Sequence, residues 1–412
     1  MAGIGTLSPG SEAETGGTGS YASETTADVV VVGGGIGGLT AALALARAGR
    51  SVRVLERAAE FTEVGAGLQL APNATRELAR LGVLDEVVSR GVLPHRLVLR
   101  DALDGSELTS LDLGEGFRRR YGGPYVVVHR SDLLDVLVAA CAAAGVALET
   151  GRATVDVRPD DDGAAVHCAD GSVHRATAVV GADGLRSSLR ARLSDDEPVS
   201  SGYVAYRGTV PFERAAAHVD PADVTVFVGP GLHCVQYALR AGEMANTVAV
   251  FRSPGYLADP SDPDWGGPQE LDAVFAGTCT PVQEALPLLW RDRRWQMYDR
   301  EPIRQWVDGR LVLLGDAAHP MLQYLAQGAC QSIEDGVTLA SSLAGTPDVP
   351  AALAGYAAVR QERTARVQAT ARTWGEIWHV DGVARLLRNE LLRRLPTDHA
   401  EHIDWLYGPP QV

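Results

Sequence analysis

Cysteine is scarce in this sequence, and nothing in its spacing suggests a pair. The 412 residues include five cysteines: Cys141, Cys168, Cys234, Cys279 and Cys330. The number is odd and no two are spaced as C-x-x-C, which argues against a disulfide framework and against a zinc site. We therefore expect no bound metal and a reducing compartment, the cytoplasm.

Long hydrophobic runs and an excess of basic residues are also missing. No run of about 18 apolar residues occurs, so no transmembrane helix is predicted. The formal net charge of −15 argues against nucleic acid as a partner. Residues 1–27 are rich in Gly, Ser, Thr and Glu and lack the basic start and apolar centre of a signal peptide. They are predicted to form a disordered tail.

A strand, a glycine-rich turn, a helix and a second strand are predicted near the N-terminus. The apolar run at residues 28–32 predicts the first strand, residues 37–49 are typical of a helix, and residues 51–56 predict the second strand. The turn has the pattern Gly33-x-Gly35-x-x-Gly38. Its glycines allow a tight turn, close approach of a pyrophosphate, and close packing of helix on strand. The pattern therefore predicts a dinucleotide site.

Further dinucleotide contacts follow from this unit. The helix begins near Ile36, where free N–H groups face the phosphates. Glu56 ends the second strand, where an acid binds ribose hydroxyls, and Arg57 follows it beside the adenine. The predicted contacts are Gly33, Gly35, Ile36, Gly38, Glu56 and Arg57.

Two more turns follow predicted strands much further along the chain. Asp183-Gly184 follows the apolar run at residues 176–181, and Gly315-Asp316 follows the run at residues 311–314. A carboxylate at a strand's carboxyl end can accept hydrogen bonds from sugar or ribityl hydroxyls. A plain nicotinamide dehydrogenase needs only the glycine-rich turn. Sites this far apart in the sequence can hold two ends of one large cofactor, which indicates FAD.

The middle of the chain has a different pattern. From about residue 200 to 295, short β-type runs at 224–228, 232–239 and 247–251 are separated by turn residues, which predicts an antiparallel sheet. Helices are expected at residues 132–144, 329–343 and 351–373. The expected divisions are a tail at 1–27, a first part of the FAD-binding domain at 28–199, a substrate-binding sheet domain at 200–296, a second FAD-binding part at 297–345, and a C-terminal helical region at 346–412.

The run at residues 232–239 carries the clearest candidates for catalysis. On a strand, His233, Val235 and Tyr237 share one face, which suits an aromatic acid. His233 is the candidate base because its unperturbed pKa is near 6.5. The alternative is a polar outer face of a two-sided sheet, with His233 merely hydrogen-bonded.

The three turns, in this order and spacing, resemble those of the group A flavoprotein aromatic hydroxylases over residues 27–408. Within this family the stretch His-Pro-Met-Leu-Gln-Tyr-Leu-Ala at residues 319–326 resembles the subgroup that acts on 3-hydroxybenzoate. The resemblance implies an α/β fold, in which a Rossmann-like FAD-binding domain carries an inserted antiparallel-sheet substrate domain and C-terminal helices. It also implies FAD as cofactor, NADH as electron donor with NADPH not excluded, and a homodimer.

The resemblance also implies roles for individual residues. Gln69, Arg130, Asp183, Gly315 and Asp316 would contact FAD, and Pro320 would contact the flavin ring. Gly328 and Ala329 would begin a helix whose dipole faces the flavin. Gln323 would hold the phenolic oxygen, and Tyr237 would orient the ring or bind the carboxylate. His319 would fix the turn before Pro320.

The reaction implied is para-hydroxylation of 3-hydroxybenzoate to 2,5-dihydroxybenzoate (gentisate). NADH would reduce FAD, and the reduced flavin would react with O2 to form a C4a-hydroperoxide that attacks the electron-rich phenolate ring. One alternative is a flavin hydroxylase of another aromatic acid, such as salicylate or a hydroxynicotinate. The other is a non-catalytic FAD-binding protein. A flavin halogenase is disfavoured because the W-x-W-x-I-P motif is missing.

Overall fold

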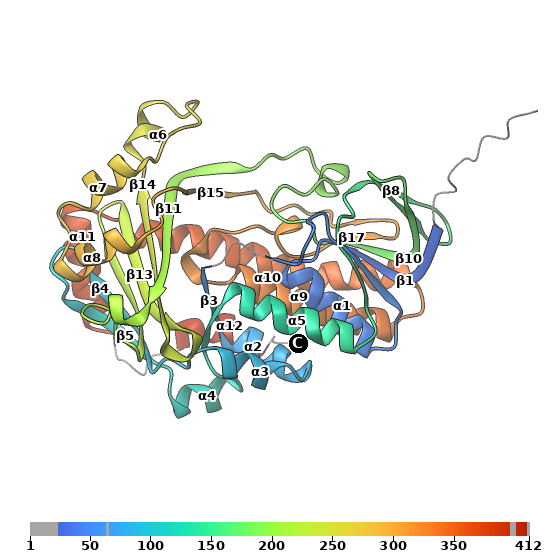
Figure 1. The fold of residues 1–412 in the computed structure, drawn as a ribbon, viewed down its shortest axis with the longest axis horizontal. Helices are drawn as coiled ribbons and strands as arrows, with labels where there is room; N and C mark the ends of the chain where they lie inside the picture. Colours follow the sequence, from blue (N-terminus) through green and yellow to red (C-terminus); the bar gives the residue numbers. More distant parts are fainter. Residues whose placement is uncertain (1–23, 63–65, 396–400, 410–412) are drawn as a thin grey trace, which may run out of the picture.

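The computed structural model describes residues 24–62, 66–395 and 401–409. Two β-sheets lie at opposite ends of the molecule, and the long helix α10 (Val349–Trp378) runs between them (Figure 1). Strand β1 (Glu24–Val32) begins inside the predicted tail, because residues 25–27 pair in register with β10 (Val173–Gly181). Residues 1–23 of that predicted tail lie outside the described residues.

The first sheet has the predicted Rossmann-like topology. Its path is β16-β17-β10-β1-β2-β7, and β8 and β9 extend it from β10. The remaining strands are β2 (Val52–Leu55), β7 (Ala147–Glu149), β8 (Thr154–Pro159), β9 (Ala164–Cys168), β16 (Val307–Asp308) and β17 (Leu311–Leu313). Strands β7, β2, β1, β10 and β17 run parallel. Val29 to Val32 are all buried, as expected for a parallel strand covered on both faces.

The second sheet has seven strands in the order β15-β11-β14-β13-β12-β4-β5. They are β4 (Arg96–Asp101), β5 (Glu107–Asp112), β11 (Val199–Pro211), β12 (Asp223–Gly229), β13 (Leu232–Leu239), β14 (Met244–Arg252) and β15 (Trp295–Asp299). The three strand predictions in this region are confirmed. However, β4 and β5 also belong to this sheet, because β12 pairs in parallel with β4. Their residues were expected to lie in the FAD-binding part. Local periodicity carries no information about such a distant pairing.

Helices cover the sheets and join them. They are α1 (Ile36–Arg47), α2 (Pro72–Arg80), α3 (Leu84–Arg90), α4 (Glu115–Tyr121), α5 (Arg130–Ala143), α6 (Pro254–Ala258), α7 (Pro268–Phe275), α8 (Thr280–Ala285), α9 (Gly328–Gly345), α11 (Gly382–Arg393) and α12 (Asp404–Tyr407), and a two-stranded ladder joins β3 (Gly67–Leu70) to β6 (Val126–His129). Helix α10 has 30 residues and extends past its predicted end at residue 373. None of the helices within the described ranges combines the length and apolar character needed to cross a membrane.

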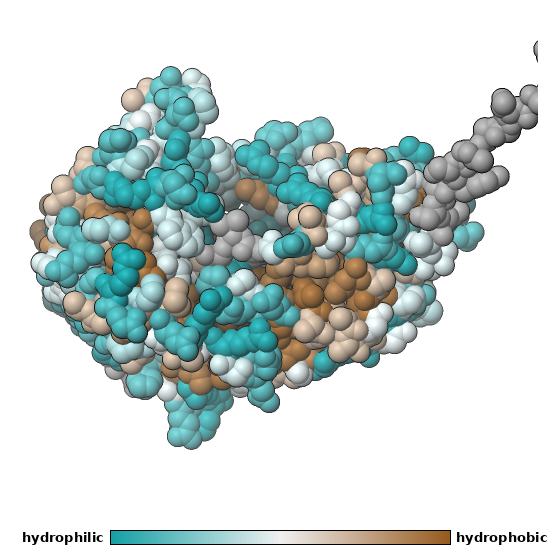
Figure 2. Space-filling view, in the orientation of Figure 1, coloured by the Kyte–Doolittle hydropathy of each residue, from teal (hydrophilic) through white to brown (hydrophobic). Residues whose placement is uncertain are grey.

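The two faces of the seven-stranded sheet have different neighbours. Leu232, Cys234 and Phe251 pack with Phe275 and Val282 of α7 and α8 in one apolar cluster. The opposite face, which carries Val235 and Tyr237, turns toward the rest of the molecule. On the outside, Figure 2 shows a largely hydrophilic face on which hydrophobic residues gather in a band over α1 and α5.

Candidate active site

The glycine-rich turn between β1 and α1 is shaped by close backbone contacts. Gly33 has a φ of +107°, and a Cβ there would lie 2.3 Å from the carbonyl oxygen of Ala182. A Cβ on Gly38 would lie 2.0 Å from the carbonyl oxygen of Gly33. Helix α1 begins at Ile36 after Gly35, and no side chain caps it. Its first N–H groups are therefore available to an anion such as a pyrophosphate.

Glu56 lies beside this turn at the end of β2. Its carboxylate accepts hydrogen bonds from the backbone N–H of Gly34 at 2.7 Å and of Ala58 at 2.8 Å. A carboxylate has about four acceptor positions, so two remain for the hydroxyls of a ribose. Arg57 is exposed next to it.

The other two turns are joined to each other. Asp183 accepts hydrogen bonds from the Ser187 hydroxyl at 2.5 Å and the Ser188 N–H at 2.9 Å, so its carboxylate shapes its own turn. The buried Arg190 donates to the carbonyl of Ala318 at 2.6 Å, directly after Gly315-Asp316. The distant turns at residues 183 and 315 are therefore held at one edge of the sheet.

A cavity of about 700 Å³ lies between the seven-stranded sheet, the start of α9 and the end of α10. The sheet contributes a row of laterally paired residues to its wall. This row is Thr109, Leu99, Val226, Val235, Val248 and Arg207. The predicted face of β13 is part of the wall, since His233 and Tyr237 flank Val235 there.

The structure brings half of the predicted site residues together in this cavity. The predicted residues that line it are Gln69, Arg130, His233, Val235, Tyr237, Asp316, Gln323, Gly328 and Ala329. The glycine turn, Glu56, Arg57, Asp183, Gly315 and Pro320 lie outside its lining. Pro320 is buried, and its carbonyl accepts a hydrogen bond from Gln368 at 2.8 Å.

Comparison with known proteins shows the family to which this chain belongs. The chain matches the model of the FAD binding domain family over residues 26–373. It is 41% identical to the 3-hydroxybenzoate 6-hydroxylase of Polaromonas naphthalenivorans (strain CJ2), over 92% of this chain and 95% of that protein. It is 37% identical to the 3-amino-4-hydroxybenzoate 2-monooxygenase of Streptomyces cremeus, over 92% and 94% of the two chains. This chain belongs to the group A flavin-dependent aromatic monooxygenases.

The fold of the monooxygenase is also that of solved family members. It is similar to the structure of Klebsiella pneumoniae HpxO complexed with FAD and uric acid, with a TM-score of 0.81 and 29% sequence identity. The similarity covers 93% of this chain and 97% of that one. The α/β fold predicted from the sequence is therefore confirmed.

The residues of the monooxygenase fit FAD at both ends of the cofactor. One end is the glycine turn with its uncapped helix α1. At the other end, α9 begins at Gly328 without a side-chain cap, and Gly328 and Ala329 line the cavity. Gln327, which precedes them, is buried, and its amide nitrogen has no hydrogen-bond partner in the described structure. Arg130 and Asp316 face the same region, and burial lowers the pKa of Arg130 while Asp316 opposes that shift.

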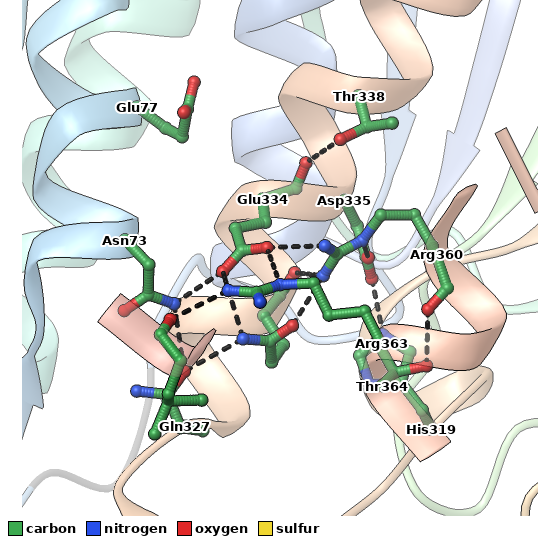
Figure 3. A network of polar contacts seen from close by, with 12 residues as sticks. Asn73, Glu77, His319, Gln327, Glu334, Asp335, Thr338, Arg360, Arg363 and Thr364 are labelled. Atoms are coloured by element: carbon green, nitrogen blue, oxygen red, sulfur yellow. Dashed lines mark hydrogen bonds and ion pairs between the residues drawn. The ribbon is translucent and has the colours of Figure 1, made fainter. Parts of the chain in front are cut away.

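A buried polar network fastens the start of α9 to α10 (Figure 3). Arg360 of α10 binds Glu334 at 2.5 Å and Asp335 at 2.6 Å. Asp335 also accepts from the Gly315 N–H at 2.9 Å and lies 2.6 Å from Nε2 of His319. His319 therefore has the structural role expected for it. The network holds the Gly315 turn and α9 in one fixed arrangement.

His233, the predicted base, is more enclosed than its sequence position suggested. Its side chain is 1% exposed, and its Nδ1 lies 2.9 Å from Nε2 of His379. The ring also stacks on His379 and meets the edge of Trp378. Burial, reinforced by His379, holds the pKa of His233 well below 6.5, so the ring is neutral at neutral pH.

Tyr237 and Gln323 approach the cavity from different elements. Tyr237 is 3% exposed, and a Cβ on Gly67 of β3 would lie 2.4 Å from its ring, so only glycine leaves room for this tyrosine. Gln323 lies in the short 3₁₀ turn Gln323–Leu325 between Pro320 and α9. On the β3 side, the Tyr125 hydroxyl donates to Oε1 of Gln69 at 2.7 Å.

Two residues of the candidate site, Arg207 and His379, were missed from the sequence. Arg207 on β11 lines the cavity and lies over the Trp295 ring at 5.4 Å. His379 directly follows α10 and contacts His233. Trp378 was expected to serve packing or an interface, and it packs against His233 in the cavity wall. The extra length of α10 carries Trp378 and His379 to the sheet, and the distance of 146 residues to His233 hides the contact from pattern analysis.

Proposed function

We propose that this monooxygenase hydroxylates 3-hydroxybenzoate para to its phenol and forms 2,5-dihydroxybenzoate, with FAD, NADH and O2. The observation that carries the proposal is that His233, Tyr237, Gln323 and Arg207 line one and the same cavity, in front of the α9 N-terminus. FAD, held by the glycine turn and the start of α9, would supply the electrophilic oxygen, with electrons from NADH and oxygen from O2. NADPH is the alternative donor.

In this proposal His233 and Gln323 act on the phenol. Nδ1 of His233 is engaged by His379, so Nε2 is the nitrogen left to accept the phenolic proton. The amide of Gln323 holds the phenolic oxygen. Deprotonation of the phenol raises the electron density on its ortho and para carbons. The electrophilic oxygen attacks only such electron-rich carbons. The apolar wall formed by Val226, Val235 and Val248 keeps water from the ring.

Arg207 supports an anionic substrate. Among the described residues, no carboxylate forms an ion pair with this guanidinium, and its Nε has no hydrogen-bond partner. Burial lowers the pKa of Arg207, and Tyr237 opposes the shift. Because a buried charge needs a partner, the carboxylate of an aromatic acid suits this position. In this proposal Arg207 binds the carboxylate and Tyr237 orients the ring.

The experiment is to measure NADH and O2 consumption by the purified FAD-loaded protein with 3-hydroxybenzoate and to identify the product by chromatography. Stoichiometric 2,5-dihydroxybenzoate is the expected result. NADH oxidation that forms only hydrogen peroxide would overturn the substrate assignment. No stimulation by any hydroxylated aromatic acid would favour the non-catalytic FAD-binding alternative. Parallel assays with NADPH settle the donor.

The second candidate is a monooxygenase of another aromatic acid. The Streptomyces relative, named for 3-amino-4-hydroxybenzoate, favours it, and salicylate and a hydroxynicotinate belong to the same class. All of these compounds have a carboxylate that Arg207 could bind. They differ in the position of the ring hydroxyl relative to that carboxylate, and therefore relative to His233. Assays with these acids under the same conditions separate the two candidates. Cytoplasmic location and a homodimer stay predictions.

A further inference from the structure

The end of α10 brings a second histidine against the candidate base. His379 follows the last residue of α10, and its carbonyl accepts a hydrogen bond from the Gly231 N–H at 3.0 Å. This bond ties the helix end to the turn between β12 and β13, two residues before His233. The Tyr203 ring stacks on His379 with a centroid separation of 4.7 Å. The backbone hydrogen bond and the stacking on Tyr203 both fix the position of the His379 ring beside His233.

The hydrogen bond between the imidazoles admits two arrangements. If His379 donates from Nε2, then His233 carries its proton on Nε2 and has no lone pair for a substrate hydroxyl. If His233 donates from Nδ1, its Nε2 is a free acceptor and His379 carries its own proton on Nδ1. Only the second arrangement allows His233 to take a proton from a phenol in the cavity.

The surroundings of the pair disfavour an imidazolium on either ring. His233 contacts Tyr324 and Trp378, and His379 contacts Tyr203 and Tyr324. Burial lowers the pKa of His379 to about 3, and the nearby Arg388 of α11 reinforces this shift. No carboxylate contacts either ring among the described residues. Asp101 binds Arg385 at 2.6 Å and also pairs with Arg388 at 3.7 Å. A proton taken from the substrate is therefore costly to keep on His233.

We propose that His379 and His233 form a proton relay for the phenol. As the phenolic O–H bond breaks, Nε2 of His233 gains the proton and its Nδ1 proton passes to Nε2 of His379. The Nδ1 proton of His379 then passes to water, so both imidazoles end neutral and the phenolate keeps the negative charge. His379 keeps 9% of its surface exposed, against 1% for His233. The proposal rests on the proposed function and adds a positioning residue to it.

The test compares His379→Gln with the native FAD-loaded enzyme. Glutamine can still accept a hydrogen bond from Nδ1 of His233 but cannot pass a proton on. We expect retained FAD, a KM for 3-hydroxybenzoate within about twofold of the native value, and hydroxylation slowed by about 10². We also expect phenolate formation by the bound substrate, followed by ultraviolet absorbance, to require a higher pH. External imidazole should restore part of the rate in His379→Ala.

Matched controls and a second measurement keep the relay separable from the proposed function. His95→Gln changes an exposed histidine outside the cavity and should leave rate and pH profile unchanged. An unshifted pH profile and rate in His379→Gln would overturn the relay, whereas failure of the native enzyme to hydroxylate any aromatic acid would overturn the proposed function. If His379→Gln loses FAD, nitrogen-15 NMR of the native protein decides. We expect His233 to be protonated on Nδ1, and protonation on Nε2 would overturn the relay.

Discussion

His233 and Arg207 present different chemistry to the same cavity. His233 offers a neutral acceptor because burial suppresses its positive charge, and Arg207 offers a cation without an acid partner among the described residues. Sequence patterning identified the histidine, since β13 alternates with a period of two. It missed the arginine, whose meaning depends on which strands pair beside it.

Replacing His233 with alanine tests its role as base. We expect His233→Ala to keep FAD and to slow hydroxylation by about 10² at neutral pH. The loss should shrink as pH approaches about 10, where a free phenol ionises without help. The measurement is the rate of product formation as a function of pH. Unchanged turnover at neutral pH would remove His233 from the mechanism.

Replacing Arg207 tests recognition of the carboxylate. We expect Arg207→Met to raise the Kd for 3-hydroxybenzoate by about 10- to 100-fold, which corresponds to loss of one charged hydrogen-bonded contact. The weak binding of phenol, which has no carboxylate, should change little. The measurement is a pair of binding titrations monitored by flavin absorbance. Equal losses for the two ligands would show that Arg207 acts through packing.

At the scale of elements, the turns and helix starts form the proposed cofactor site. Helices α1 and α9 both begin without a side-chain cap. Gly33 has a positive φ in the turn before α1, and Gly315 has one in the turn that follows β17, ahead of α9 in the sequence. The sequence predicted both turns, because glycine and acidic residues after apolar runs are local features. It did not predict the network that fixes them, since Arg360 and Asp335 lie on different helices.

Replacing Glu56 tests the role of the glycine-rich turn in FAD binding. We expect Glu56→Ala to weaken FAD retention, because the change removes the proposed ribose acceptor and also the acceptor of the Gly34 N–H. Flavin content after gel filtration and the Kd of the reconstituted protein are the measurements. The variant Glu60→Ala, which removes an exposed acid four residues further on, is the control. A Glu56→Ala protein with native FAD affinity would contradict the ribose assignment.

Replacing Arg360 tests how much the buried polar network contributes to stability. We expect Arg360→Met to lower the free energy of unfolding by about 3–5 kcal/mol, because Glu334 and Asp335 would lose a buried cation. Urea denaturation measures this. Arg394→Met removes an exposed pair with Glu390 and should cost about 0.3–0.5 kcal/mol. Similar losses in both variants would mean that the network contributes little to stability.

At the scale of the whole molecule, buried ionisable groups make stability depend on pH. The pKa of His379 is lowered to about 3 by burial and Arg388. Burial opposes ionisation of Asp335, but His319 and Arg360 hold the pKa of this acid down to about 2. In both cases the unfolded chain binds the proton at a higher pH than the folded one. Stability is therefore full above the unfolded pKa values and falls with pH below them.

We expect the midpoint of urea denaturation to fall in two stages on acidification. The first stage lies below pH 6.5 and reflects His233 and His379. The second lies between the ordinary pKa of 3.8 and about 2 and reflects Asp335 together with other ion-paired acids. His379→Gln should flatten the first stage only. A midpoint that stays constant from pH 7 to pH 4 would contradict the buried neutral pair.

The sequence by itself determined the α/β class, the glycine-rich and acidic turns at strand ends, and the face of β13 that lines the cavity. These features are local, because apolar runs, glycines and two-residue alternation act on neighbouring residues. Only the tertiary structure decided that β4 and β5 join the substrate sheet, that Arg207 faces the cavity, and that His379 touches His233. Each of these features depends on strand pairing between distant segments or on where the 30-residue helix α10 ends. The periodicity of the sequence predicts neither of them.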